Sequence, residues 1–123
     1  MRIVNARTNQ AIATAVEMAD TRATRRRGLL GRDHLDPGAG LMLAPCFMIH
    51  TAFMRFSIDV VFLDRYGFVI RVVRSLPAWR MAVAPGARMT LELPSGAVGS
   101  CDVRVGDHLY LVPPATAPAV TAA

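Results

Sequence analysis

Short apolar runs separated by turn-forming residues recur along most of this chain. Residues 2–4 and 13–18 are β-branched or alternate between apolar and polar positions, and the turn-prone pair Asn9-Gln10 lies between them. This pattern is typical of short strands joined by tight turns. Further strands of the same kind are predicted at residues 41–44, 88–93 and 108–112.

The clearest element is a β-hairpin formed by residues 58–63 and 68–73. Its linker, Asp64-Arg65-Tyr66-Gly67, suits a type I turn followed by a glycine in the left-handed conformation. A three-residue loop would place Phe62 opposite Ile70. Both faces of the hairpin are mostly apolar, so we expect it to lie in the middle of the fold.

One α-helix is predicted at residues 21–30. Asp20-Thr21 offers an N-cap, and Gly31 suits the position that follows the last helical residue. The segments 33–40 and 76–86 contain proline and glycine and are predicted as loops. Many short strands with a single helix predict a mainly β fold, bordering on α+β, of the small antiparallel sandwich or barrel type.

The length of 123 residues fits one domain, which we place at residues 1–112. Hydrophobic residues make up 53% of the chain, which is enough to fill a core without a metal or disulfide. Residues 113–123 are alanine, proline and threonine with one valine. This segment cannot bury an apolar face and is predicted to be disordered.

The formal net charge is +5, and all fourteen basic residues are arginine. Apart from the run at residues 25–27, the arginines are dispersed between Arg2 and Arg104. A nucleic-acid-binding protein usually clusters such charges on one face. The distribution therefore disfavours nucleic acid as a partner.

Neither a cofactor nor a metal site is predicted. Cys46 and Cys101 stand alone in the sequence, and the three histidines have no metal-ligand spacing. The amino terminus shows no apolar signal-peptide core, and the uncharged, mostly apolar run at residues 40–54 is shorter than the roughly 20 residues that a membrane-spanning helix needs. We therefore expect a cytoplasmic protein without a membrane span.

Several separated motifs, in order, resemble the prokaryotic family called domain of unknown function 192. The resemblance extends over about residues 10–112 and rests on Arg25-x-x-Gly28-Leu29-Leu30-Gly31-Arg32, Ile49-His50-Thr51-x-Phe53-Met54-Arg55-Phe56, Ile58-Asp59-Val60-Val61-Phe62-Leu63-Asp64-x-x-Gly67, Leu91-Glu92-Leu93-Pro94-Ser95-Gly96 and Gly106-Asp107. It implies a small, mostly β domain that is jelly-roll-like, with a helix packed alongside. The family has no established activity, and many of its members are secreted.

Two departures from the family pattern limit what the resemblance implies about activity. Many relatives have Trp-Met-Lys-Asn where this chain has Phe53-Met54-Arg55-Phe56, and a proline often stands where this chain has Ser57. The chain therefore resembles a branch marked by His-Thr and Met-Arg-Phe. An activity found in the other branch should therefore not be transferred to this chain without a test.

Asp59 lies in an apolar strand, so its carboxylate must find partners or perform chemistry. It could act as a general base or ligand anchor with a pKa displaced by burial. A structural role is the favoured interpretation, because Arg71 would lie diagonally across the hairpin. Arg55 or nearby backbone N–H groups could serve equally as the partner.

His50 is a candidate acid, base or ligand-binding residue, and a hydrogen bond to a backbone carbonyl is its structural alternative. Cys46 lies four residues earlier and could pair with His50 as a nucleophile, although Pro45 disfavours a helix there. The predicted ligand-binding set combines these polar groups with nearby apolar and aromatic side chains: His50, Thr51, Met54, Arg55, Asp59 and Trp79.

Three functions remain open from the sequence. The first is a binding module whose loops around residues 50–56 and 76–86 form a shallow pocket for a small polar or acidic ligand. The second is a hydrolase or lyase in which His50 is the general acid or base and Asp59 or Asp107 is its partner. The third is an accessory domain that binds a protein. Convergence of His50, Arg55 and Asp59 in one open cleft would support the first two.

Overall fold

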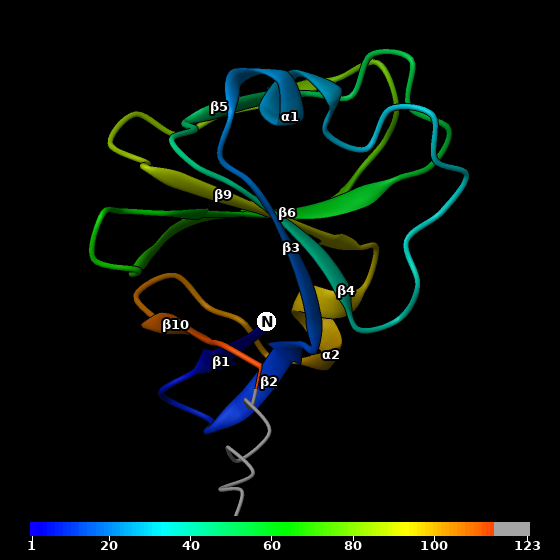
Figure 1. Ribbon diagram of the computed structural model, residues 1–123. Helices are drawn as coiled ribbons and strands as arrows, with labels where there is room; N and C mark the ends of the chain where they lie inside the picture. Colours follow the sequence, from blue (N-terminus) through cyan, green and yellow to red (C-terminus); the bar gives the residue numbers. More distant parts are fainter. Residues whose placement is uncertain (115–123) are drawn as a thin grey trace, which may run out of the picture.

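Three layers of β-structure are stacked in this protein (Figure 1). The computed structural model describes residues 1–114, so the predicted disordered segment 113–123 falls almost wholly outside the described residues. The elements follow in the order β1 (Arg2–Asn5), β2 (Gln10–Ala13), β3 (Ala15–Ala19), α1 (Arg22–Arg27), β4 (Ala39–Leu43), β5 (Met48–His50), β6 (Ile58–Leu63), β7 (Val69–Leu76), β8 (Met81–Val83), β9 (Met89–Pro94), α2 (Ala97–Ser100) and β10 (Leu109–Val112).

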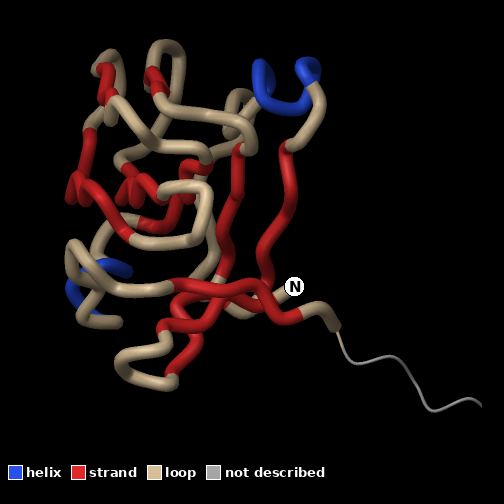
Figure 2. The backbone as a smooth tube through the Cα atoms, turned by 90° about the vertical axis from the view of Figure 1, so that its left-hand side faces the viewer, coloured by secondary structure: helices blue, strands red, loops and turns tan. Residues whose placement is uncertain are grey.

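The middle layer is a five-stranded sheet in the order β3-β4-β9-β6-β7. On one side it faces the three-stranded sheet β10-β1-β2, and on the other it faces α1 and the two-stranded sheet β5-β8. Figure 2 shows α1 at one end of the molecule and the three-stranded sheet at the other. The mainly β sandwich predicted from the sequence is confirmed. One strand pair, β3 with β4, runs parallel.

Alternate residues of the central strands supply two separate cores, one on each face of the middle sheet. Val61 and Leu63 of β6 pack with Leu91 and Leu93 of β9 against the three-stranded sheet. Ile58, Val60 and Phe62 pack on the opposite face, toward α1 and β5. Because successive side chains of a strand point to opposite faces, each polar residue of β6 or β9 is committed to one core or the other.

The β6–β7 hairpin forms as predicted near its turn but not beyond it. Asp64 N–H donates to Phe68 O at 2.9 Å, and Leu63 pairs with Val69. A β-bulge then shifts the register by one residue, so Phe62 lies opposite Arg71 rather than Ile70. The predicted diagonal contact between Asp59 and Arg71 is therefore wrong, because an extra residue in one strand displaces every later pair.

Helix α1 is shorter than predicted, since it ends at Arg27 instead of Leu30. Thr21 caps its start, and the side chains and N–H groups of Thr21 and Thr24 satisfy each other. Gly28, with φ +48°, accommodates the turn that ends the helix. The chain must turn there because Leu29, only 2% exposed, enters the core instead of continuing along the helix surface.

Other predicted boundaries also differ from the structure. The single strand expected at residues 13–18 is divided at Thr14, whose N–H donates to Gly38 O at 2.8 Å, into β2 and β3. Strand β5 ends at His50, where the predicted loop 50–56 begins, and its partner β8 lies within the segment predicted as the loop 76–86. No helix of the described residues is long and apolar enough to cross a membrane.

Candidate functional site

Glu92 is a buried carboxyl group in the central strand β9. It pairs in register with Val60 of β6 and Leu41 of β4, so it shares the face of the sheet that looks toward α1. The residue is 4% exposed, and its Oε2 atom has no hydrogen-bond partner among residues 1–114. Burial raises the pKa of the carboxyl to about 7, against the opposing influence of the positive charge of Arg32.

The carboxyl of Glu92 borders a pocket with a volume of about 110 Å³. The pocket lies between α1, the turn that follows it, and strands β4, β5 and β9. Its walls combine three consecutive arginines with apolar side chains, the full lining being Arg25, Arg26, Arg27, Gly28, Leu29, Leu30, Leu43, Ile49, His50, Met54 and Glu92. A lining that combines a buried carboxyl with arginines can receive a ligand that carries both a hydrogen-bond donor and an anionic group.

Local sequence explains why basic residues lie at the pocket rim. The capping box at Thr21 fixes where α1 starts, and Gly28 fixes where it ends. The last turn of α1 therefore presents Arg25, Arg26 and Arg27. Arg25 is anchored by hydrogen bonds from Nη1 to Asp20 O at 3.0 Å and to Ala44 O at 3.3 Å.

Two members of the predicted site set border this pocket, namely His50 and Met54. His50 ends strand β5 opposite Met81 of β8 and is exposed. Met54 is 8% exposed and belongs to the core that underlies α1. The structure therefore brings a titratable ring and an apolar wall to the same pocket as Glu92.

Thr51 and Trp79 belong to one hydrogen-bonded junction outside the pocket. The buried Thr51 hydroxyl donates to Pro77 O at 2.6 Å and accepts from Arg80 N–H at 2.9 Å. Trp79 N–H donates to Thr51 O at 3.0 Å. The Trp79 indole is 59% exposed and packs edge-on against Phe53, with 4.5 Å between ring centroids.

Arg55 and Asp59 do not reach the pocket. Arg55 forms a salt bridge with Asp33 in which both side chains are more than 60% exposed. Asp59 is fully buried on the opposite face of the sheet, where its Oδ1 accepts from Ser75 N–H at 2.8 Å and its Oδ2 accepts from Gly96 and Val98 N–H groups at 3.1 and 2.9 Å. The sequence left Arg71, Arg55 and backbone N–H groups open as partners of Asp59, and the backbone N–H groups are the ones that bind it.

The expected convergence of His50, Arg55 and Asp59 is therefore wrong. His50 lies on the α1 side of the middle sheet, Asp59 on the other side, and Arg55 on the surface. Asp59 follows the alternation of β6, in which its neighbours Ile58 and Val60 occupy the core near α1. Sequence reasoning that grouped these residues by proximity along the chain could not separate the two faces.

Two other pairs considered from the sequence, Cys46 with His50 and His50 with Asp107, form no hydrogen bond within residues 1–114. The Cys46 thiol donates to Met48 O at 3.2 Å. Asp107 lies at the far end of the molecule, where it accepts from Arg7 Nε at 2.7 Å and Asn5 Nδ2 at 2.8 Å. The hydrogen bond from Arg7 is the largest cause that holds the pKa of Asp107 at about 2. Within residues 1–114, no three His, Cys, Asp or Glu side chains are grouped to hold a metal ion.

Neither Glu92 nor the arginines of α1 were predicted as members of this site. The sequence does carry a signal, since Glu92 interrupts an otherwise apolar strand core at Leu91-Glu92-Leu93. A charged residue in the middle of a sheet is buried, and a buried charge needs either a partner or a function. Its surroundings depend on α1, which is more than sixty positions away in the chain.

Comparison with known proteins places this chain among uncharacterised relatives. A protein of unknown function from Novosphingobium aromaticivorans has a similar structure, with a TM-score of 0.80 and 18% identity over 90% of this chain and 84% of that one. A proposed transcription regulator from Sinorhizobium meliloti gives a TM-score of 0.77 and 20% identity over 89% of each chain. At these identities the likeness concerns the fold alone.

Sequence similarity is stronger to a UPF0127 protein of Thermococcus sibiricus. The two chains are 34% identical over an alignment 103 positions long, which covers 76% of this chain and 64% of that protein. The chain thus spans slightly less than two thirds of this relative. The profile of DUF192, a family described as "Uncharacterized ACR", matches residues 3–111. On this match across nearly all of the described residues, the chain belongs to the DUF192 family.

Proposed function

We propose that this protein is a binding module for a small polar ligand that carries a hydrogen-bond donor and an acidic group. The ligand occupies the pocket between α1, β5 and β9. The donor reaches Glu92, and the acidic group lies toward the arginines of residues 25–27. The single observation that carries this proposal is the buried, unpartnered Oε2 of Glu92, a residue that lines this pocket.

The buried Oε2 atom of Glu92 lacks a hydrogen-bond partner within residues 1–114, and this lowers the stability of the ligand-free protein. A buried polar group without a partner costs about 1–3 kcal/mol relative to a paired one. A ligand amine, hydroxyl or amide that donates to Glu92 would remove this cost, whereas a purely apolar ligand would not. The arginines supply the complementary charge for a carboxylate or phosphate.

The size of the pocket restricts the ligand. A volume of about 110 Å³ is close to the share of liquid volume of about four water molecules. It therefore suits a short amino acid, a hydroxy acid or the polar end of a longer molecule. His50 borders the pocket and supplies a second polar contact.

Ligand-induced thermal stabilisation tests the proposal. Short amino acids, hydroxy acids and simple carboxylic acids are screened against the wild type, and Glu92→Gln is compared with Glu17→Gln. Glu17 lies in the same sheet, but its side chain is 61% exposed and paired with Arg32. We expect a ligand to raise Tm in the wild type and in Glu17→Gln, and to lose most of this effect in Glu92→Gln. Equal stabilisation of all three proteins, or of none, contradicts the proposal.

A hydrolase or lyase is the second candidate, because one observation favours it. A carboxyl with a pKa of about 7 that lines a pocket is suited to give and take protons at neutral pH. In this version Glu92, rather than Asp59, shares the pocket with His50. Turnover of a ligand found by the thermal screen, abolished in Glu92→Gln but with binding retained, would distinguish catalysis from binding.

A further inference from the structure

The outer side of the two-stranded sheet β5–β8 is an exposed apolar surface. Ile49 and Ala82 point inward and are 6% and 4% exposed, whereas Met48, Met81 and Val83 point outward and are 50%, 65% and 39% exposed. The solvent-facing side of an antiparallel sheet is normally polar. This side carries His50 and otherwise apolar side chains.

Aromatic side chains extend this surface at the neighbouring turns. Phe47, Phe53 and Trp79 are 55%, 72% and 59% exposed. Six of the eleven exposed large hydrophobic residues of the described chain are thus gathered here, and we call them the β5–β8 face: Phe47, Met48, Phe53, Trp79, Met81 and Val83.

The backbone holds two of these rings outward. Phe53 and Trp79 both have φ of +64°, a conformation that bulky residues rarely adopt. The hydrogen bonds of buried Thr51 fix the segment between Pro77 and Arg80 and so offset this strain. Exposure of the Phe53–Trp79 pair is therefore a feature of the folded backbone and does not result from side-chain rotation alone.

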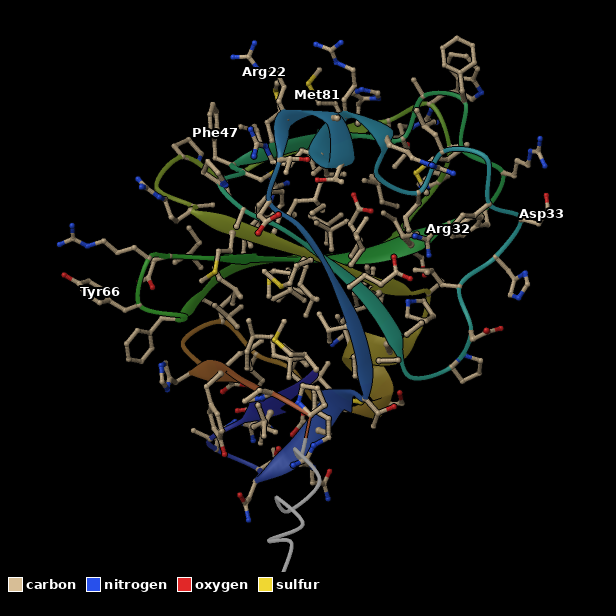
Figure 3. The ribbon with its side chains drawn as sticks, in the orientation of Figure 1. Arg22, Arg32, Asp33, Phe47, Tyr66 and Met81 are labelled. Carbon is tan, nitrogen blue, oxygen red and sulfur yellow. The ribbon has the colours of Figure 1, made fainter. Side chains whose placement is uncertain are left out.

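The segments that carry the β5–β8 face hold charges of one sign. The sequence has no aspartate or glutamate in residues 21–32, 44–58 or 77–91, which contain α1, β5, β8 and the neighbouring turns, and Asp33 just beyond them is paired with Arg55. Arg22, Arg26 and Arg80 are exposed, and no salt bridge reaches them from within residues 1–114. Figure 3 shows Arg22, Met81 and Phe47 at the same end of the molecule. The complementary partner is therefore both apolar and anionic.

We propose that the β5–β8 face docks on an anionic lipid surface. Exposed Trp, Phe and Met side chains would enter the boundary between headgroups and acyl chains, while the arginines contact anionic headgroups. The residues of this face project outward, and none of them lines the Glu92 pocket, so they suit a flat, deformable surface better than an inserted peptide. A second copy of the chain is disfavoured, because self-association would bring unpaired arginines together. This proposal is independent of the Glu92 pocket.

The position of Trp79 provides a direct test, since it is the only tryptophan of the chain. The full chain is mixed with vesicles of phosphatidylcholine alone or of equal parts phosphatidylcholine and phosphatidylglycerol. Co-sedimentation measures binding, and the emission maximum of Trp79 reports whether its indole leaves water. We expect binding and a blue shift only with phosphatidylglycerol, both weakened by added salt.

Two variants and a matched control test separately the apolar side chains and the arginines of this surface. Phe53→Ser combined with Met81→Ser removes apolar contacts and keeps the reporter, and R22Q/R26Q/R80Q removes charge. Each should lower the vesicle partition coefficient by about tenfold or more. The control is R65Q/Y66S, at the turn between β6 and β7, where Tyr66 is 63% exposed. It should bind like the wild type.

Several results would overturn the proposal. These are absence of binding to phosphatidylglycerol vesicles, equal binding to both vesicle types, or equal weakening by the R65Q/Y66S control. A single-stranded oligonucleotide and an acidic peptide serve as competing partners. If either binds the wild type more tightly than the anionic vesicles do, and the β5–β8 variants abolish that binding, the face recognises that macromolecule instead of lipid. Far-UV circular dichroism of each variant confirms that it is folded.

Discussion

Asp59 and Glu92 are carboxylates of the neighbouring strands β6 and β9, yet they point to opposite faces of the same sheet. Asp59 pairs in register with Leu93, and Glu92 pairs with Val60. Asp59 accepts three backbone hydrogen bonds, whereas Oε2 of Glu92 accepts none within residues 1–114. The two acids therefore differ in their surroundings: Asp59 satisfies buried backbone donors, whereas Glu92 is the group that we propose to bind a ligand.

Replacing Asp59 should destabilise the fold strongly. Asp59→Ala leaves the N–H groups of Ser75, Gly96 and Val98 without their acceptor, and each unsatisfied buried donor costs about 1–3 kcal/mol. Because the surroundings can relax, we expect a total loss of about 3–5 kcal/mol in the free energy of unfolding. Urea denaturation at neutral pH measures it.

A suitable control for that measurement is Asp36→Ala. Asp36 is 78% exposed and pairs only with the exposed His34, so its removal should change stability by less than about 0.5 kcal/mol. A loss below about 1 kcal/mol for Asp59→Ala would show that its three hydrogen bonds do not hold β7 and α2 to β6.

Glu92 should make the protein less stable as pH rises from about 4.5 to about 7. Its pKa is raised from 4.5 to about 7 in the folded state, so over this range the folded chain binds more protons than the unfolded chain. The stability present below pH 4.5 is therefore lost progressively up to about pH 7, by about 3 kcal/mol in total. Urea denaturation across this range measures the change.

Glu92→Gln provides the comparison. The neutral amide cannot ionise, so the variant should lack this pH dependence and be more stable than the wild type at about pH 8. Glu17→Gln, which alters an exposed carboxylate, should keep the wild-type profile between pH 4.5 and 7. Parallel profiles for the wild type and Glu92→Gln would show that Glu92 ionises normally in the folded protein.

Features fixed by local sequence could be predicted, and those fixed by distant pairing could not. Asp64 and Gly67 determine the hairpin turn through short-range contacts, so the turn was predicted correctly. The bulge between Leu63 and Phe62 lies beyond the turn, as does a second irregularity between Val60 and Ile58, where Asp59 accepts from the N–H group of Ser75, sixteen residues away. A register derived from the turn alone cannot include these displacements.

The candidate site, too, could be predicted only where it depends on local sequence. His50 and Met54 were predicted to bind ligand, and they do border a pocket. Its carboxyl, however, comes from Glu92, more than forty positions later in the chain, and its basic rim comes from α1. Strand alternation reveals that Glu92 and Asp59 are buried, but only the packing of α1 on the sheet shows which one faces an open space.

Asp107 should stabilise the protein at neutral pH and lose this effect in acid. The hydrogen bond from Arg7 is the largest cause that holds its pKa at about 2, below the usual 3.8. A lowered pKa gives stability that is present above pH 3.8 and is lost as pH falls through about 2. Because Arg7 is partly exposed to solvent, we expect a contribution of about 1–2 kcal/mol.

Asp107→Asn tests this contribution by acid titration of the folded fraction at a fixed urea concentration. The variant should be less stable than the wild type at neutral pH, and the difference should shrink as pH falls from about 4 toward about 2. A constant difference across that range would show that the ionisation of Asp107 is unaffected by Arg7 and Asn5.

Thr51→Val should loosen the segment that carries Trp79. Valine has nearly the same shape as threonine but lacks the hydroxyl that donates to Pro77 O and accepts from Arg80 N–H. Because Thr51 is fully buried, we expect a loss of about 1–3 kcal/mol in the free energy of unfolding. The fluorescence anisotropy of Trp79 should also fall, since its backbone is held through Thr51.

Thr51→Ser is the matched variant, because it keeps the hydroxyl and removes only a methyl group. It should retain the wild-type anisotropy and lose less stability than Thr51→Val. If both variants lower the anisotropy equally, packing of the methyl group, and not the two hydrogen bonds, positions the exposed pair Phe53 and Trp79. The comparison therefore tests directly whether one buried hydroxyl determines how the aromatic side chains of the β5–β8 face are presented.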